Sequence, residues 1–420
     1  MEKILLVTVK MESEKDNWRI EDMTEELEAL AGACAVEIVD SVSCSCHKPT
    51  AKFFIGSGKA QELAVLAQEE GVDTVVFGCD LSGTQQRNLE EIIGKKTIDR
   101  TQLILDIFAR RARSPEGKMQ VELAQMQYLL PRLLGYGIVM SRTGGGIGTS
   151  GPGEQVLEID RRRIRKKVDR LRQDLKDTSR HRQVMRKKRK DNALSSVALV
   201  GYTSAGKSTL INALTDAGQA VTGRLFTTLD PLYKKLQLPN GENIVISDTV
   251  GFLHNLPHHL VEAFKATLEE LTEADLLVHV LDVSHPLVFE RNKAVLQVLS
   301  EFGAQDKPTV TVLNKIDLVE DKVWLARIES EFPSAVSVSA KLKQNLDVLL
   351  VKIQESFTSR MVKAEIIVQH ARMDLVDLFY RQGRVEDIQY LQKGIKVKLS
   401  LPKVLFQKLL HSREIEEVKS

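Results

Sequence analysis

The segment that most constrains this chain is Gly-Tyr-Thr-Ser-Ala-Gly-Lys-Ser at positions 201 to 208. It matches the pattern G-x-x-x-x-G-K-[ST] and lies between an apolar run, Val197 to Val200, and a helix-forming stretch that begins at Thr209. In this pattern the glycines let the backbone wrap around phosphates, the lysine reaches the terminal phosphates, and the last hydroxyl ligates Mg²⁺. The sequence therefore predicts a nucleoside triphosphate site on a strand–loop–helix unit.

Three later segments follow in the order expected of a GTP site. Asp248 to Gly251 end an apolar run, and they offer a carboxylate for the Mg²⁺ shell and a glycine N–H for the γ-phosphate. Asn314 to Asp317 follow a second run, and a carboxylate there accepts two hydrogen bonds that guanine offers and adenine does not. Ser339 to Lys341 follow a third run and would back the base through main-chain contacts. Each segment alone also fits a turn cap, so only the ordered set indicates GTP.

The segment from Phe226 to Pro231 lies between the phosphate loop and Asp248, where switch I is expected. Thr228 is the candidate to join the Mg²⁺ shell when the γ-phosphate is present, and Thr227 is the alternative. Phe252 stands where many small GTPases carry the glutamine that orients the attacking water. An aromatic ring cannot do this, so we expect slow intrinsic hydrolysis, with the missing group supplied by a partner or another switch residue.

The predicted site comprises three overlapping sets of residues. The predicted catalytic residues are Lys207, Thr228 and Gly251, and the predicted magnesium ligands are Ser208, Thr228 and Asp248. The predicted nucleotide-contacting residues are Gly201, Tyr202, Thr203, Ser204, Ala205, Gly206, Lys207, Ser208, Thr209, Phe226, Thr227, Thr228, Asp248, Thr249, Val250, Gly251, Asn314, Lys315, Asp317, Ser339, Ala340 and Lys341.

A chain of 420 residues exceeds a single ordinary core, so several packed units are expected. Short β-branched runs alternate with helix-period stretches in residues 1–105 and again in 193–360, which predicts a small α/β unit and a GTPase domain with a parallel sheet. Residues 106–192 predict a helical hairpin, and residues 361–420 a small α+β domain. The predicted fold class is therefore α/β with these two additions.

The hairpin is predicted from two apolar seams with coiled-coil spacing. The first seam consists of Met119, Leu123, Met126, Leu130 and Leu133, and the second of Leu157, Ile164, Val168, Leu171 and Leu175. We expect the two helices to pair antiparallel. Between them, residues 135–153 contain eight glycines in nineteen residues, a composition that cannot form a core.

Basic charge is concentrated in the second helix of this hairpin. Residues 154–191 hold 16 Lys and Arg against 7 Asp and Glu, a balance of +9 that leaves −7 for the rest of a chain whose net charge is +2. A solvated helix face is the alternative reading, but the adjoining glycine-rich loop favours binding to phosphate backbones of RNA. Tyr136 is the loop's only aromatic residue, so contacts to shape and phosphate are expected rather than base readout.

Other features are consistent with a cytoplasmic protein. The start of the chain lacks the long apolar run of a signal peptide, and no segment approaches the ~20 apolar residues of a membrane span. The four cysteines, Cys34, Cys44, Cys46 and Cys79, are interpreted as reduced thiols. Gly56 to Lys59 are interpreted as a helix start, with a second nucleotide site as the lesser alternative. We expect a monomer.

Motifs along most of the chain resemble the HflX GTPases, relatives of the Obg group within the translation-factor class of P-loop GTPases. Besides the nucleotide motifs and Leu256-Pro257, they are Phe54 to Lys59, Leu81-Ser82, Gln85 to Leu89, Asp99 to Thr101, Gly117 to Gln125, Gly144 to Gly148, Gly151 to Glu154 and Asp160 to Arg162. The resemblance implies a GTPase that binds the large (50S) ribosomal subunit and its rRNA. It also implies help in splitting or rescuing ribosomes, notably under heat stress, with the glycine-rich loop inserted toward the peptidyl transferase centre.

The sequence departs from the family pattern in three places. Ser204 stands where the family usually has Asn, which bears on potassium-assisted hydrolysis, and Ser150 stands where Arg is common. Gln155-Val156 replace the usual Thr-Gln. The alternative function is a GTP-regulated binding module that acts on ribosome assembly or on a protein partner, with the hairpin as a docking arm. A third reading is an ATP-driven enzyme.

Overall fold

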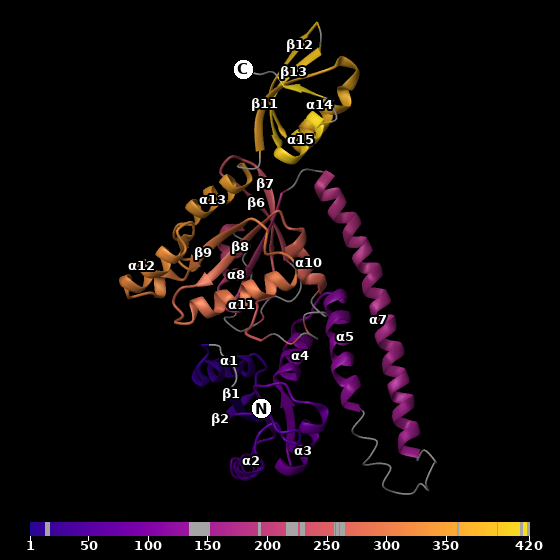
Figure 1. Cartoon of the computed structure of the whole chain (residues 1–420), viewed down its shortest axis with the longest axis vertical. Coiled ribbons are helices and arrows are strands. Elements are labelled where there is room, and N and C mark those ends of the chain that lie inside the picture. Colours follow the sequence, from indigo (N-terminus) through magenta and orange to yellow (C-terminus); the bar gives the residue numbers. More distant parts are fainter. Residues whose placement is uncertain are drawn as a thin grey trace.

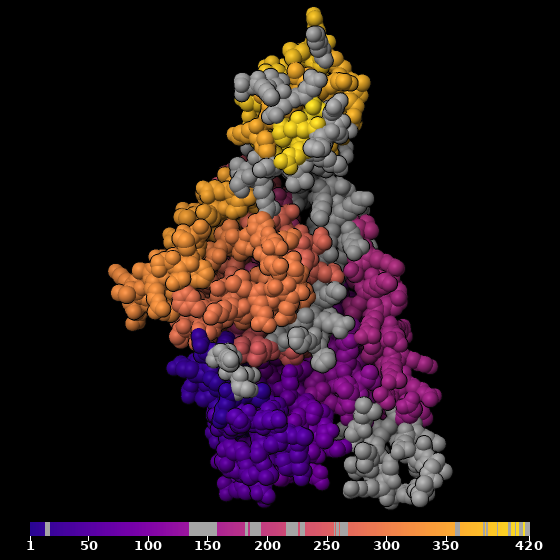
Figure 2. Space-filling model, in the orientation of Figure 1, coloured from indigo at the N-terminus to yellow at the C-terminus, as the bar shows by residue number. Residues whose placement is uncertain are grey.

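The computed structural model describes residues 1–12, 17–133, 152–191, 195–215, 226, 232–255, 257, 260, 265–358, 361–392, 394–411 and 415–417. Three units follow one another along the long axis of the molecule, and a long helix lies along one side (Figures 1 and 2). The predicted α/β class is confirmed, with its N-terminal α/β unit, parallel sheet, helical hairpin and small C-terminal domain.

The N-terminal unit is a parallel sheet of strand order β2-β1-β3-β4 between two layers of helices. Its elements are β1 (Lys3–Met11), α1 (Ile20–Gly32), β2 (Glu37–Cys46), α2 (Ser57–Glu69), β3 (Thr74–Phe77), α3 (Gly83–Ile93), β4 (Lys96–Asp99) and α4 (Arg100–Arg111). Leu6 packs with α1 and α4, whereas its neighbour Leu5 packs with α2 and α3. Both faces of β1 are therefore buried, which explains its continuous apolar run. The predicted boundary at residue 105 falls within α4, which packs on this sheet.

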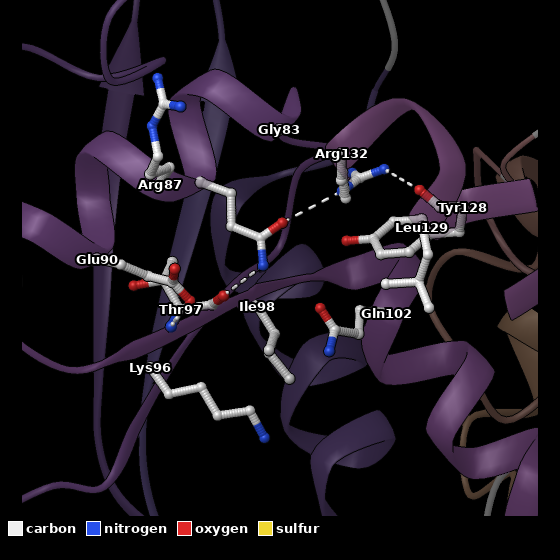
Figure 3. A pocket seen from close by; sticks show the side chains of 11 residues that line it. Gly83, Arg87, Glu90, Lys96, Thr97, Ile98, Gln102, Tyr128, Leu129 and Arg132 are labelled. Carbon is white, nitrogen blue, oxygen red and sulfur yellow. Dashed lines mark hydrogen bonds between the residues drawn. The ribbon is translucent and has the colours of Figure 1, made fainter. Parts of the chain in front are cut away.

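Side chains of α3 cover the outer edge of β4. Gln86 Nε2 donates to the Thr97 carbonyl at 2.8 Å, and Thr97 N donates to Glu90 Oε1 at 3.2 Å (Figure 3). An edge strand with unpaired backbone groups is a template for pairing with another chain. Gln86 and Glu90, one helical turn apart on α3, bond to the backbone groups of Thr97 and so prevent another strand from pairing there.

The hairpin is formed by α5 (Pro115–Arg132) and α7 (Pro152–Asp191), which run antiparallel (Figure 1). Leu123 of α5 is buried against Val168 and Leu171 of α7. Met119, Met126, Ile164 and Leu175 pack around this cluster. These residues belong to the two predicted seams, so the coiled-coil spacing did identify the contact. Lys167 of α7 also pairs with Glu122 of α5.

Arg132 fixes the end of α5 to the N-terminal unit. Its guanidinium donates to the Leu81 carbonyl at 2.6 Å and to Asp99 Oδ2 at 2.8 Å, and it lies 3.4 Å from the centre of the Tyr128 ring. The Tyr128 hydroxyl donates to Asp99 Oδ1 at 2.8 Å. Beside this cluster is a cavity of about 240 Å³, into whose lining Lys96, Gln102 and Leu129 also extend (Figure 3). Because residue 135 begins the glycine-rich segment, the cluster anchors one base of that loop.

The central unit is a six-stranded sheet of order β10-β9-β8-β5-β7-β6, in which only the edge strand β6 is antiparallel to its neighbour. Its elements are β5 (Ser196–Gly201), α8 (Lys207–Thr215), β6 (Leu232–Gln237), β7 (Asn243–Asp248), α10 (Lys265–Glu273), β8 (Leu276–Asp282), α11 (Val288–Glu301), β9 (Thr309–Asn314), α12 (Lys322–Glu331), β10 (Val336–Val338) and α13 (Leu346–Thr358). Residues of α8 and α13 pack on one face, and residues of α10 and α11 on the other. The parallel strands bring their carboxyl ends to a single edge.

The C-terminal unit is an antiparallel sheet of order β12-β13-β11-β14 with two helices. Its elements are β11 (Met361–Val368), α14 (Met373–Gln382), β12 (Arg384–Leu391), β13 (Gly394–Pro402), α15 (Lys403–His411) and β14 (Glu416–Glu417). Phe379 of α14 and Val397 of β13 are fully buried in its core. In the part of the chain that the structure describes, none of the helices has the length and apolar character needed to cross a membrane.

The Arg132 cluster predicts the effect of one substitution. Arg132→Met keeps much of the side-chain length but leaves the fully buried Asp99 without its cationic partner, which should destabilise this region by about 3 kcal/mol. We expect faster hydrogen exchange at the amides of β4 and at the end of α5. Arg165→Met, on the exposed side of α7, is the control and should leave these amides unchanged. Equal protection in both variants would contradict the anchoring role.

Candidate nucleotide site

The loop after β5 adopts a conformation that requires its two glycines. Gly201 and Gly206 have φ angles of 154° and 96°. A Cβ at Gly201 would lie 2.4 Å from the Val280 carbonyl oxygen, and a Cβ at Gly206 would lie 2.3 Å from Asn314 Nδ2. Any larger residue would therefore push the loop away from β8 and β9. The loop is held against the carboxyl edge of the sheet, as the phosphate-loop motif predicts.

Ser204 also adopts a left-handed conformation, with φ at 60°. Asn is better tolerated than Ser in this region of conformational space, because its short amide can hydrogen-bond locally. The Asn that the resemblance to HflX GTPases leads us to expect here would suit this backbone conformation better than serine. Ser204 is exposed, so its side chain is not needed for packing.

Lys207 is buried at the start of α8 and is oriented by the loop that precedes it. Its Nζ donates to the carbonyls of Gly201 and Tyr202 at 3.0 and 2.8 Å. These bonds use two of three ammonium protons and leave one for a phosphate. Burial lowers the pKa of Lys207 to about 8, while the Asp248 carboxylate acts in the opposite direction. A bound phosphate would favour the charged form further.

Ser208 and Asp248 lie side by side, although forty residues separate them in sequence. The Ser208 hydroxyl donates to Asp248 Oδ2 at 2.6 Å. Asp248 ends β7 and is fully buried, and the next residue, Thr249, donates from Oγ1 to the Leu199 carbonyl at 2.6 Å. A hydroxyl and a carboxylate are the oxygen ligands that Mg²⁺ prefers, so the pair fits the predicted metal site. Thr227 and Thr228 lie outside the described residues.

Gly251 and Phe252 pack directly against the phosphate loop. A Cβ at Gly251 would lie 2.8 Å from Thr203 Cα and 3.1 Å from Lys207 Nζ. Thr203 N donates to the Phe252 carbonyl at 2.8 Å, and Phe252 N donates to the Gly201 carbonyl at 3.2 Å. The Phe252 ring is 1% exposed and lies in the core. This phenylalanine therefore anchors the segment, and its position leaves no role for it in activating water.

The predicted base-recognition segments are joined by one buried amide. Asn314 Nδ2 donates to the Ala205 carbonyl at 2.8 Å, and Ala340 N donates to Asn314 Oδ1 at 3.0 Å. The Ser339 hydroxyl donates to Asp317 Oδ1 at 2.6 Å. The structure thus brings the phosphate loop, Asn314 to Asp317 and Ser339-Ala340 together at one edge of the sheet. Lys341, which follows, is exposed.

Two polar residues that the sequence did not single out also lie here. Asp282, at the end of β8, pairs with Lys315 at 2.6 Å and so holds a lysine whose φ is 67°. A signal existed, because Asp282 ends an apolar run as Asp248 does. His279 is buried in the same strand, and burial together with the Lys207 charge lowers its pKa to about 4. It is therefore neutral at physiological pH.

The remaining predicted contacts lie close by. Thr209 is half-buried in the first turn of α8, and Val250 is buried between Thr249 and Gly251. Phe226 is the described residue of the predicted switch I, and its ring packs edge-on against Phe108 of α4 with centroids 4.6 Å apart. That side chain is therefore committed to the contact with the N-terminal unit.

Comparisons with known proteins agree with this geometry. Three family descriptions match: "GTP-binding GTPase N-terminal" over residues 21–109, "GTP-binding GTPase Middle Region" over 111–189, and "50S ribosome-binding GTPase" over 196–315. GTPase HflX of Caldanaerobacter subterraneus subsp. tengcongensis is 44% identical over 378 residues, 90% of this chain and 87% of that one. The chain belongs to the HflX family of GTPases. The prediction of a GTPase of this family is thereby confirmed.

A second HflX GTPase is similar to nearly the whole chain, and a solved structure matches it at lower identity. GTPase HflX of Lacrimispora saccharolytica is 42% identical over 408 residues, which are 97% of this chain and 95% of that one. A solved GDP complex of the protein SsGBP is 26% identical, covers 84% of this chain and 98% of its own, and superposes with a TM-score of 0.47.

The position of Asn314 predicts a strong effect of its removal. Asn314→Ala leaves the buried Ala205 carbonyl and the Ala340 amide without their partner, at ~1–3 kcal/mol each. GDP affinity, measured by calorimetry, should fall about 100-fold. The control Asn243→Ala removes an exposed amide of β7 and should bind GDP normally. A similar loss in both variants would show that the bridge is not responsible.

Proposed function

We propose that this protein is a GTP-hydrolysing switch that binds the large ribosomal subunit and helps to split or rescue ribosomes. The observation that carries the ribosomal part is the row of exposed cations on α7, described below, together with the match to "50S ribosome-binding GTPase". We further propose that the protein acts in the cytoplasm as a monomer and under stress such as heat.

The nucleotide part follows from the geometry of the site. Lys207 would hold the β- and γ-phosphates, and the N–H of Gly251 would meet the γ-phosphate. Ser208, Asp248 and, from switch I, Thr228 would hold Mg²⁺, which neutralises charge that develops on the phosphates. Asp317, fixed by Ser339, would accept the two donors of guanine.

Hydrolysis by the isolated protein should be slow. Phe252 occupies the position after Gly251 and is buried, so no side chain there can orient water. Its backbone is also fixed by Gly201 and Thr203. A group from a partner, or another switch residue, would complete the site. This arrangement suits a switch whose lifetime is set by the ribosome.

Helix α7 carries the charge expected of an RNA-binding arm. Among its described side chains, nine cations are exposed: Arg162, Arg163, Arg165, Lys166, Lys167, Arg170, Arg172, Lys176 and Arg180. Arg165, Arg172 and Lys176 share one face, about 100° around the helix from the seam with α5. These three residues form no ion pair with a described carboxylate, so they remain available to phosphates. The exposed flank of α7 is visible in Figure 2.

The alternative is a GTP-regulated binding module that acts on ribosome assembly or on a protein partner. A protein-docking arm would rely on an apolar face, but the apolar seam of α7 is already used by α5. The exposed face is cationic instead, which favours RNA.

The guanine assignment predicts a change of specificity. In the wild type, ATP should not compete for a labelled GTP analogue. Asp317→Asn replaces an acceptor of two hydrogen bonds with an amide, so GTP affinity should fall about 100-fold while ATP affinity stays unchanged. Competition titrations measure both. An ATP preference in the wild type, or an unchanged GTP affinity in Asp317→Asn, would contradict the assignment.

The RNA-binding face predicts ribosome association that depends on charge. With a non-hydrolysable GTP analogue, the wild type should co-sediment with large subunits, reduce the intact ribosome peak, and lose binding as salt rises. Replacing Arg165, Arg172 and Lys176 together by Gln should weaken binding and lower the salt dependence. The matched control replaces the exposed Lys293, Lys322 and Arg327 of the GTPase domain by Gln. If the wild type did not co-sediment with large subunits, the ribosomal proposal would be wrong and the GTP-regulated binding module would be favoured.

A further inference from the structure

The N-terminal unit contacts the GTPase domain through a defined group of residues, which we call the latch. On the N-terminal side it comprises Trp18, Glu26 and Arg100, and on the GTPase side Tyr202, His254 and Asn255. The surrounding apolar residues of the two units form one continuous core cluster, which includes the contact between Phe108 and Phe226. The two units therefore meet beside the phosphate loop, beside Phe226 of the predicted switch I, and beside residues 248–255, which we call switch II.

The centre of the latch is the Tyr202 hydroxyl. It donates to Glu26 Oε2 and accepts a hydrogen bond from His254 N at 2.7 Å. Tyr202 is 3% exposed, and burial together with the Glu26 carboxylate raises its pKa well above the usual value. The hydroxyl therefore keeps its proton. One side chain of the phosphate loop thus joins an acidic residue of the N-terminal unit to the backbone of switch II.

Arg100 and Trp18 contact the two switch II residues of the latch, Asn255 and His254. Arg100 pairs with Glu26, with side-chain exposures of 11% and 10%, and its Nη1 donates to the Asn255 carbonyl at 3.3 Å. The Trp18 ring stacks on the His254 ring with centroids 4.4 Å apart. Because the charged pair is largely buried, removing the charge of Glu26 should weaken the whole group.

His254 of the latch lies three positions along the chain from Gly251, whose N–H is expected to meet the γ-phosphate. His254 follows Gly251 along switch II, and Phe252 between them is bonded to the phosphate loop through Gly201 and Thr203. The Tyr202 carbonyl, on the same residue as the latched ring, accepts from Lys207 Nζ. In this arrangement Gly251 lies close to Lys207, since a Cβ added at Gly251 would lie 3.1 Å from Lys207 Nζ. A γ-phosphate bound by both groups needs them near each other.

We propose that Glu26, Trp18 and Arg100 are positioning residues for the GTPase site, which hold residues 251–255 in the arrangement that favours a bound triphosphate over a diphosphate. The proposal rests on the proposed role of Gly251 at the γ-phosphate. By thermodynamic linkage, a contact that favours one position of switch II raises affinity for the ligand that needs that position. Loosening the latch must then weaken GTP binding and leave GDP binding largely unchanged.

A purely structural interface makes a different prediction. It would lower the melting temperature when broken, and it would change both nucleotide affinities equally or not at all. The ratio of the two affinities therefore separates a positioning role from a structural one.

The test uses the full-length chain and two single variants, Glu26→Gln and Trp18→Leu. Glu26→Gln keeps the shape of the side chain and removes its charge. Glu25→Gln, at an exposed position of the same helix, is the matched control. Dissociation constants are measured for a fluorescent non-hydrolysable GTP analogue and for fluorescent GDP. Thermal melts confirm that each variant is folded.

We expect the dissociation constant of the GTP analogue to rise about 5-fold or more in both latch variants, with GDP changed less than about 2-fold. Tyr202→Phe removes the hydroxyl that joins Glu26 to His254 N, so the combined Glu26→Gln and Tyr202→Phe variant should lose less GTP affinity than the sum of the two single losses. An unchanged ratio, an equal weakening of both nucleotides, or a selective loss of GDP would overturn the proposal. Failure of the wild type to bind guanine nucleotides would instead overturn the proposed function.

Discussion

The nucleotide site depends on the buried side-chain amide of Asn314. Parallel strands bring the loops after β5, β9 and β10 to one edge, where the buried backbone groups of these loops need hydrogen-bond partners. Asn314 supplies such partners by donating to Ala205 and accepting from Ala340. The proximity of Asn314 also explains why position 206 is glycine, because a Cβ there would clash with the Asn314 amide nitrogen. The glycine of the phosphate-loop motif is thus required by its neighbour in the fold as well as by the phosphates.

The N-terminal unit contacts the GTPase domain at this same edge of the sheet, so the contact lies beside the nucleotide site. Apolar residues of α1 and α4 share a core cluster with Tyr202, Phe226 and Phe252. An interface on the opposite edge of the sheet would add stability without reaching the switch segments. At this edge, the polar contacts of Tyr202 extend to His254 and hence to the segment that carries Gly251.

Local patterns predicted the features that depend on local chemistry. The phosphate loop, the strand ends and the seam of Leu123 with Val168 and Leu171 all follow from spacing. The sequence hides the helical period of α4, because its residues from Leu103 to Phe108 are almost all apolar and pack between two units. Strand β6 is a half-exposed edge without a continuous apolar run. The contact of Tyr202 with Glu26 joins residues 176 positions apart, and neither residue type signals it.

Two adjacent residues, Asp99 and Arg100, connect the arm to the nucleotide site. Asp99 ends β4 and holds Arg132 at the end of α5, whereas Arg100 begins α4 and holds Glu26 and Asn255. The side chains of Asp99 and Arg100 are both largely buried. The end of α5 is thus connected to switch II by one peptide bond and a few hydrogen bonds. In the proposed RNA-bound state, a displacement of α5 would act first on Asp99, through Arg132. Because Arg100 is the next residue along the chain, the contacts that hold the end of α5 and the contacts of the latch meet at one peptide bond.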